Sequence, residues 1–245
     1  MQIILSDIQD RLIKGLSHRM NNILTLFHGY LGLLLDNEKL DPVTLEGLEK
    51  IKDGARIATE LMDRTNAIVS PTNLTPRGIV MEQFLTQLLP TFEKIAGTTK
   101  ITIECSKDTV QAWADPSRVR LALTEIVKNA CEAAGPTGNV RIVVAPADSA
   151  PEKAMFPRDV RDLTNWTTIS VIDDGPGIAI SVEDKVYEPF TTTKKKQAIA
   201  GLGLTVAVNC MRQIGGGIDH ESTKGRTVFR LTLPVHDGVS ARAVA

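Results

Sequence analysis

Three short segments, in a fixed order along the chain, decide the fold: Glu125-Ile126-Val127-Lys128-Asn129-Ala130, Asp173-Asp174-Gly175-Pro176-Gly177-Ile178 and Gly201-Leu202-Gly203-Leu204. The first lies in a helix-like apolar pattern, the second directly follows a strand-like run, and the third opens another apolar helix. Glycines and polar side chains at the ends of such elements allow a ligand to approach the backbone closely. Together the segments predict a nucleotide pocket.

The first segment places two polar side chains on one helix face, because Glu125 and Asn129 are four residues apart. An asparagine carbonyl is a suitable oxygen ligand for Mg2+, which takes few protein ligands and otherwise uses water and phosphate oxygens. Glu125 is then a candidate to hold a metal-bound water or to orient the attacking group. For this pair alone, an ordinary exposed Glu and Asn is the favoured alternative.

The second segment turns sharply after the apolar strand Ile169–Ile172. Gly175 and Gly177 lack a Cβ, so a flat base can lie against their backbone. A carboxylate at the strand end, Asp173, can accept a hydrogen bond from an exocyclic amine and so select adenine. The alternative is an acidic tight turn, since Asp-Gly and Pro-Gly are common turn pairs.

The third segment begins a helix at Gly201-Leu202-Gly203, where backbone N–H groups at the positive end can bind phosphate oxygens. Lys194-Lys195-Lys196 is the only strongly basic run, and it lies just before this helix. A charge run is usually a solvated face, but one in this position can close over a triphosphate. The ordered set of segments is more specific than any glycine motif alone.

Length and charge limit the class of protein. The chain has 245 residues, 42% of them hydrophobic, and a net charge of -1, which gives no overall drive toward nucleic acid or an anionic membrane. No apolar run approaches the roughly 20 residues needed to span a bilayer, so we expect no membrane insertion. The three cysteines form no CxxC pair and indicate reduced thiols in a cytoplasmic protein.

The N-terminal part predicts a helical hairpin. Two apolar stripes at helical spacing are separated by a polar break that ends at Pro42. A hairpin of this kind buries its stripe more completely in a four-helix bundle of two copies, so we expect a homodimer. The stripes consist of Leu5, Ile8, Leu12, Leu16, Met20, Ile23, Phe27, Tyr30 and Leu34, and of Leu45, Leu48, Ile51, Ala55, Ala58, Met62, Thr65 and Val69.

A break at Ser70-Pro71-Thr72-Asn73 suggests two domains, residues 1–72 and 73–245. Beyond it the alternation of helices and strands predicts an α+β sandwich with the helices on one face of the sheet. The polar stretch from Pro146 to Asn165 is expected to be a connection that runs over the protein surface. The expected helices are Met81–Ala96, Pro116–Ala134 and Leu202–Ile214, and the expected strands are Ile101–Cys105, Val140–Ala145, Thr167–Ile172, Gly217–Ser222 and Thr227–Pro234.

From about Leu74 to Pro234 the chain resembles the ATP-binding domain of sensor histidine kinases, in the superfamily that includes gyrase, Hsp90 and MutL. Glu125–Asn129 is similar to the N box, Asp173–Gly177 to the G1 box, the run from Tyr187 to Lys194 to the F box, and Gly201–Leu204 to the G2 box. The resemblance implies ATP and Mg2+ as cofactors: Asn129 binds Mg2+, Asp173 binds adenine, and Lys194 with the Gly201-Leu202-Gly203 backbone binds the phosphates.

Residues Leu5–Val69 resemble the dimerisation and phosphotransfer domain of the same family, with His18 in the phosphoacceptor position. Two departures stand out. Arg19 occupies the place of the acidic residue that usually helps to take the imidazole proton, and a permanent cation cannot be that base. The run from Gln197 to Ala200 lacks the glycines usual before the G2 box, which predicts a stiffer lid.

The leading hypothesis is a dimeric histidine kinase core that phosphorylates His18 from Mg2+–ATP and passes the phosphoryl group to an aspartate of a response-regulator receiver domain. The resemblance implies that Asn22, one turn past His18, positions a water for the reverse phosphatase reaction. A second hypothesis is a phosphotransfer adaptor with an inactive ATP domain, motivated by Arg19 and by the glycine-poor run from Gln197 to Ala200. A third, an ATP-hydrolysing clamp, does not explain His18.

Overall fold

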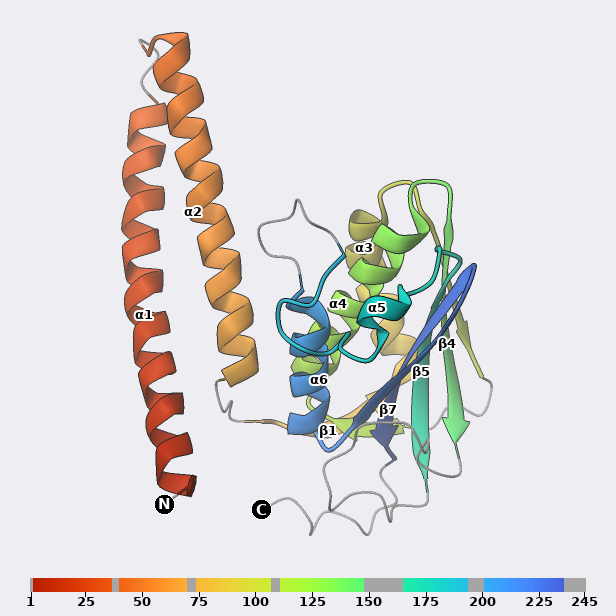
Figure 1. The fold of residues 1–245 in the computed structure, drawn as a ribbon. Coiled ribbons are helices and arrows are strands. Elements are labelled where there is room, and N and C mark those ends of the chain that lie inside the picture. Colours follow the sequence, from red (N-terminus) through yellow and green to blue (C-terminus); the bar gives the residue numbers. More distant parts are fainter. Residues whose placement is uncertain are drawn as a thin grey trace. The chain divides into compact units, whose positions relative to one another are not determined.

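The computed structural model describes residues 2–36, 40–69, 74–106, 111–147, 165–193 and 201–235, with side chains in the first helix from residue 19 onward. The chain forms two compact units (Figure 1). One contains two long helices, and the other contains two sheets with their helices. None of the helices in these ranges is long and apolar enough to cross a membrane.

The first unit is a hairpin of α1 (Gln2–Leu35) and α2 (Pro42–Val69). Asp41 begins α2, because its Oδ1 accepts the backbone N–H groups of Val43 at 3.0 Å and Thr44 at 3.1 Å. These are two of the N–H groups that a helix start leaves without an intrahelical partner. The hairpin core consists of Leu24, Leu31 and Ala55, with Leu48, Ala58 and Met62 packed against it.

The stripe expected on α1 is not the face that packs on α2. Met20, Ile23 and Phe27 are 39%, 47% and 51% exposed, while Leu24 and Leu31 of the neighbouring face are buried. Helical periodicity identifies an apolar face without identifying its partner, and α1 carries apolar residues around more than one side. Within the hairpin, the described part of the expected stripe, from Met20 to Leu34, is therefore left uncovered.

The second unit is built on a five-stranded sheet with the order β2-β4-β5-β7-β6. Strand β2 pairs with β4 in parallel, and the other pairs are antiparallel. Among the described residues, β2 and β6 are the edge strands. The bounds are Lys100–Cys105 for β2, Asn139–Ala147 for β4, Trp166–Asp173 for β5, Gly217–Thr223 for β6 and Arg226–Pro234 for β7.

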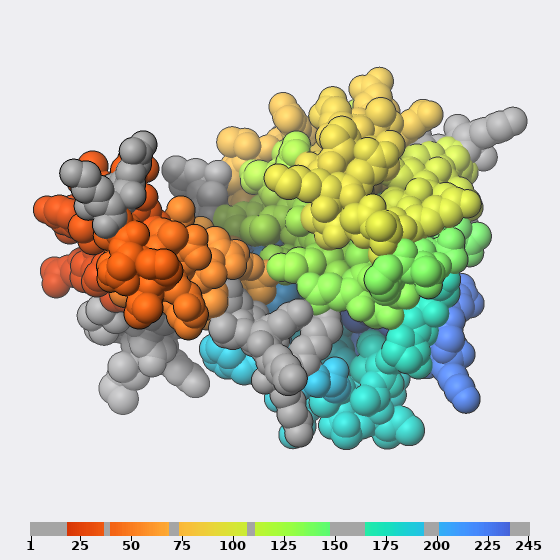
Figure 2. Space-filling view, turned by 90° about the horizontal axis from the view of Figure 1, so that it is seen from above, coloured from red at the N-terminus to blue at the C-terminus, as the bar shows by residue number. Residues whose placement is uncertain are grey.

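Helices α3 (Met81–Ala96), α4 (Pro116–Ala134) and α6 (Gly203–Gln213) cover one face of this sheet (Figure 1). Alternate residues of β4, namely Val140, Ile142 and Val144, are buried, as expected for a strand with one covered face. In the space-filling view, α3 and β2 lie side by side in the yellow part of the chain (Figure 2). The expected α+β architecture with helices on one face is confirmed.

Three short elements were not expected from the sequence. Strands β1 (Arg77–Val80) and β3 (Gln111–Ala114) form a separate two-stranded antiparallel sheet, and α5 (Ile180–Glu183) is a single helical turn. Each has four residues, too few for a periodic apolar pattern to identify. The cysteines are free thiols, with Cys131 and Cys210 buried, as the sequence indicated. The stretch from Pro146 to Asn165 lies largely outside the described residues.

Candidate functional site

Helix α4 carries the first segment, and its start is fixed by hydrogen bonds. Asp115 caps the helix by accepting the Ser117 N–H at 2.8 Å, and it also accepts the Thr75 N–H at 2.8 Å. Proline at position 116 suits the first helical position, where its missing N–H has no intrahelical partner to lose. Two turns further on, Glu125 is 8% exposed, and Asn129 is half-buried.

The third segment approaches the first. A methyl group on Gly203, the first residue of α6, would lie 2.7 Å from Glu125 Oε2 and 3.5 Å from Asn129 Nδ2. Only glycine therefore fits at this position without moving Glu125. The structure brings together two segments that lie more than 70 residues apart in the sequence, as the nucleotide-pocket hypothesis requires.

Asp173 is the last residue of β5 and is only 3% exposed. Its Oδ1 accepts the Gly175 N–H at 3.0 Å. Burial raises the pKa of this carboxyl to about 6, because removal from water disfavours the charged form. Among the described residues, no ion pair of Asp173 with a cation is found, so the carboxylate keeps acceptor capacity for a ligand.

The adjacent carboxylate, Asp174, has a different role. Its Oδ1 accepts the Asn139 N–H at 2.9 Å and its Oδ2 accepts Asn139 Nδ2 at 2.7 Å. These hydrogen bonds hold the pKa of Asp174 below its usual value. The bond from the Asn139 side chain has the larger effect, followed by the bond from its backbone N–H. Asp174 therefore fastens the end of β5 to the start of β4, which leaves the buried Asp173 as the candidate carboxylate for recognition.

The glycine turn after Asp173 is wedged between α4 and the β6–β7 hairpin. A methyl on Gly175 would lie 2.8 Å from the Ala133 carbonyl carbon, and one on Gly177, whose φ is 89°, would lie 2.6 Å from the Thr223 oxygen. The Ile178 N–H donates to Ser222 Oγ at 2.7 Å. The two glycines thus allow the turn to approach backbone on both sides.

Thr227 also lies at this site, although the sequence pattern did not predict it as a site residue. It lies directly opposite Asp173 in the β5–β7 register and is 3% exposed. Cross-strand partners face the same side of a sheet, so its hydroxyl shares the buried side with the Asp173 carboxyl. The only local signal is a threonine after the turn Lys224-Gly225, at the beginning of a strand.

The segment similar to the F box is anchored through Tyr187. Its hydroxyl lies 3.0 Å from His220 Nδ1 of β6, and its backbone oxygen accepts the Thr205 hydroxyl of α6 at 3.0 Å. The Tyr187 ring makes an edge contact with Phe229. Three residues further on, Phe190 has a positive φ of 64°, an uncommon conformation for a side chain of this size. This segment is therefore tied to both α6 and the sheet.

The residues present fit a magnesium ion held mainly by a nucleotide. Among the described residues, no group of three His, Cys, Asp or Glu side chains is placed to hold a metal ion. Mg2+ needs few protein ligands when phosphates supply the others. The Asn129 amide and the Glu125 carboxylate share one helix face near Gly203 and would be the residues that hold the ion.

The structure describes only some of the remaining candidate residues. His18 lies in α1, with its side chain outside the described part, and Lys194 is also outside it. Asn22 is exposed on α1. Gly201 has a φ of 85°, which favours glycine, and Leu202 is buried directly before α6.

Residues 114–237 match the family described as histidine kinase-, DNA gyrase B- and HSP90-like ATPase. The chain is 26% identical over 226 residues to the sensor kinase CckA of Brucella abortus, covering 91% of this chain and 24% of that protein. It is 26% identical to the sensor histidine kinase ZraS of Escherichia coli, covering 92% and 45%, and 27% identical to the sensory histidine kinase/phosphatase NtrB of E. coli O157:H7, covering 91% and 62%. The chain thus spans less than two thirds of these relatives.

Two solved structures show the same fold. Full-length ShkA in complex with AMPPNP superposes with a TM-score of 0.69 at 21% identity, covering 92% of this chain and 46% of that one. The Acinetobacter baumannii histidine kinase AdeS gives 0.57 at 17% identity, covering 90% and 98%. With these matches, the resemblance to the catalytic core of sensor histidine kinases is confirmed.

Proposed function

Because the chain belongs to the family of histidine kinase-, DNA gyrase B- and HSP90-like ATPases, we propose that it is the core of a two-component histidine kinase. In this proposal it transfers the γ-phosphoryl group of ATP to His18 and then to an aspartate of a response-regulator receiver domain. The chain's similarity to CckA, ZraS and NtrB over both units supports this assignment.

One observation carries the proposal: two separate segments converge on α4, which carries the third, with the spacing of a nucleotide. The turn after Asp173 packs against Ala133, near the C-terminal end of α4, and Gly203 approaches Glu125 and Asn129 nearer its start. Eight residues of helix separate Glu125 from Ala133, which is about 12 Å at 1.5 Å per residue. A base at Asp173 and phosphates near Gly203 therefore lie about one nucleotide apart.

The buried groups have defined roles in this mechanism. Asp173, ionised above pH 6, accepts a hydrogen bond from the adenine amine, and Thr227 lines the same side of the sheet. The α6 N-terminus offers backbone N–H groups to the phosphates. Asn129 and Glu125 would hold Mg2+, which neutralises phosphate charge when bound. Positioning and charge neutralisation are what phosphoryl transfer requires of a protein.

At the acceptor, a neutral imidazole nitrogen of His18 would attack the γ-phosphorus while the bond to the leaving ADP oxygen breaks. The imidazole proton must then leave the ring. Arg19 is exposed and permanently cationic, so it cannot accept that proton. We expect slow autophosphorylation for this reason. Asn22 would position a water for the reverse, phosphatase reaction.

The proposed assembly is a cytoplasmic homodimer. The uncovered apolar side chains of α1, including Tyr30 at 67% and Leu33 at 72% exposed, supply a surface for a second hairpin. Four-helix packing of two hairpins buries such a surface. A response-regulator receiver domain is the expected partner in phosphotransfer.

A second candidate is a phosphotransfer adaptor that has lost kinase activity. Arg19 in place of an acidic residue favours it. Two features favour the kinase: Gly203 fits closely against Glu125, and Asp173 is a buried carboxylate. A site that no longer binds ATP would not need to retain these residues.

The test is incubation with γ-labelled ATP and Mg2+, followed by assay for acid-labile, base-stable label on the chain. We expect label in the unaltered protein, no label in His18→Gln, and equal ATP affinity in both by calorimetry. Label that persists in His18→Gln would overturn the acceptor assignment. ATP binding without any label in the unaltered protein would favour the adaptor.

A further inference from the structure

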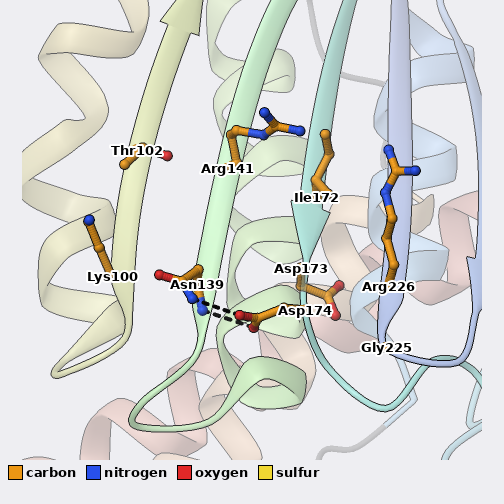
Figure 3. A pocket seen from close by; sticks show the side chains of 9 residues that line it. All are labelled: Lys100, Thr102, Asn139, Arg141, Ile172, Asp173, Asp174, Gly225 and Arg226. Atoms are coloured by element: carbon orange, nitrogen blue, oxygen red, sulfur yellow. Dashed lines mark hydrogen bonds between the residues drawn. The ribbon is translucent and has the colours of Figure 1, made fainter.

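The uncovered face of the main sheet carries a hollow whose cationic side chains have no role in the proposed kinase reaction. It has a volume of about 400 Å³ and lies where β2, β4, β5 and β7 come together (Figure 3). The side chains of Lys100, Arg141 and Arg226 stand in front of the sheet, and the helices lie behind it. Ile172 lies on this face of β5, and the largely buried Asp173 borders the hollow at the end of the same strand.

The hollow has an excess of available positive charge. Lys100 and Arg226 have no ion-pair partner within the described ranges, and Arg141 lies 3.8 Å from Glu104 with both side chains about half exposed. An exposed pair at that distance contributes little and leaves the guanidinium available. The Asp174 carboxylate at the rim is already engaged by two donors of Asn139.

The spacing of the cations limits the ligand. Arg141 is on β4 and Arg226 is on β7, with β5 between them. Adjacent strands are about 4.8 Å apart, and Arg226 lies two residues along β7 from Val228, which is level with Arg141, so the two side chains start about 12 Å apart. A ligand that engages both therefore needs more than one anionic group. Guanidinium groups bind phosphate through paired hydrogen bonds, and the Thr102 hydroxyl adds a further donor.

We propose that this hollow is a binding site for a small ligand that carries at least two phosphate groups. The volume lies within the range of small-molecule sites, about 300–1,000 Å³. Ile172 forms the floor between the cations and provides an apolar contact. The hollow and the proposed nucleotide pocket meet at Asp173, which borders the hollow at the end of β5. The proposal is independent of whether His18 is phosphorylated.

The test follows the Ile172 methyl signal of the full-length chain by NMR during titration with inorganic tripolyphosphate, without Mg2+ and at low salt. We expect a saturable shift at Ile172. Arg141→Gln combined with Arg226→Gln should weaken binding at least tenfold. Arg77→Gln combined with Lys94→Gln, which removes the same charge elsewhere on the same unit, should change it less than twofold. Unchanged ATP affinity in both double variants verifies that they are folded.

Three results would overturn the proposal. The first is a shift confined to Ile126 and Ile178, which would place the probe in the nucleotide pocket. The second is equal weakening in the two double variants, which would indicate attraction by net charge alone. The third is tighter binding of hexaglutamate than of tripolyphosphate, which would make the face a docking surface for acidic peptides.

Discussion

Replacing Asp173 by asparagine should stabilise the ATP-binding unit and at the same time weaken nucleotide binding. The carboxyl is 3% exposed and has a pKa of about 6 instead of the usual 3.8. At 1.36 kcal/mol for each pH unit, holding the ionised form in this environment costs about 3 kcal/mol at neutral pH. Asparagine has a similar shape, still accepts from the Gly175 N–H, and carries no charge.

The sign of the pH dependence follows from the raised pKa. Between pH 4 and 6 the folded chain binds a proton at Asp173 that the unfolded chain has released, so the unaltered protein gains stability as the pH falls through this window. The advantage of Asp173→Asn should therefore be about 3 kcal/mol at pH 7.5 and about 1 kcal/mol at pH 4.5. Its ATP affinity should fall about 10- to 150-fold, the equivalent of one hydrogen bond to a charged group.

Urea unfolding followed by tryptophan fluorescence measures this stability selectively. The chain has two tryptophans, Trp113 and Trp166, and both belong to the ATP-binding unit. Asp174→Asn is the matched control, because hydrogen bonds from Asn139 lower the pKa of Asp174. That variant should lose stability at neutral pH and keep its ATP affinity. An Asp173→Asn variant that is no more stable than the unaltered chain at pH 7.5, or that binds ATP equally well, would refute the reasoning.

Three further predictions use other parts of the chain. Ile23→Asp on the uncovered face of α1 should convert a dimer into a monomer by light scattering, whereas an unaltered protein that is already monomeric would contradict the four-helix interpretation. Gly203→Ala should weaken ATP binding at least tenfold by calorimetry, because its methyl would lie 2.7 Å from Glu125 Oε2, while a tolerated alanine would show that Glu125 moves freely. Arg19→Glu should raise the initial rate of His18 labelling by about 10²-fold or more, since general-base assistance is typically worth about 10²–10⁴-fold; an unchanged rate would show that proton removal is not limiting.

The sequence alone predicted the bounds of helices whose ends carry a local signal. The helices Met81–Ala96 and Pro116–Ala134 have the predicted bounds. Each is followed by a glycine with positive φ, Gly97 or Gly135, a common way for a helix to end. The four-residue strands β1 and β3 could not be found this way, because their only regularity is their pairing with each other.

The candidate site was predictable only where its residues lie in one local segment. Glu125 and Asn129 share a face by helical spacing alone. The contribution of Thr227 depends on the register of two strands that are far apart in the sequence, and no local pattern encodes that register. The same is true of Asn139, whose hydrogen bonds distinguish Asp174 from its neighbour. Adjacent carboxylates look alike in a sequence until their partners are known.

The position of β2 at the sheet edge bears on how the protein behaves at high concentration. Within the described part of the chain, β2 pairs with β4 alone, so its other side offers unpaired backbone groups to any second strand. Lys100 and Glu104 lie on its exposed face, and charged side chains on an edge strand oppose pairing between molecules. Replacing both with valine would leave six residues of high β-propensity without a charge and make this edge a site of aggregation.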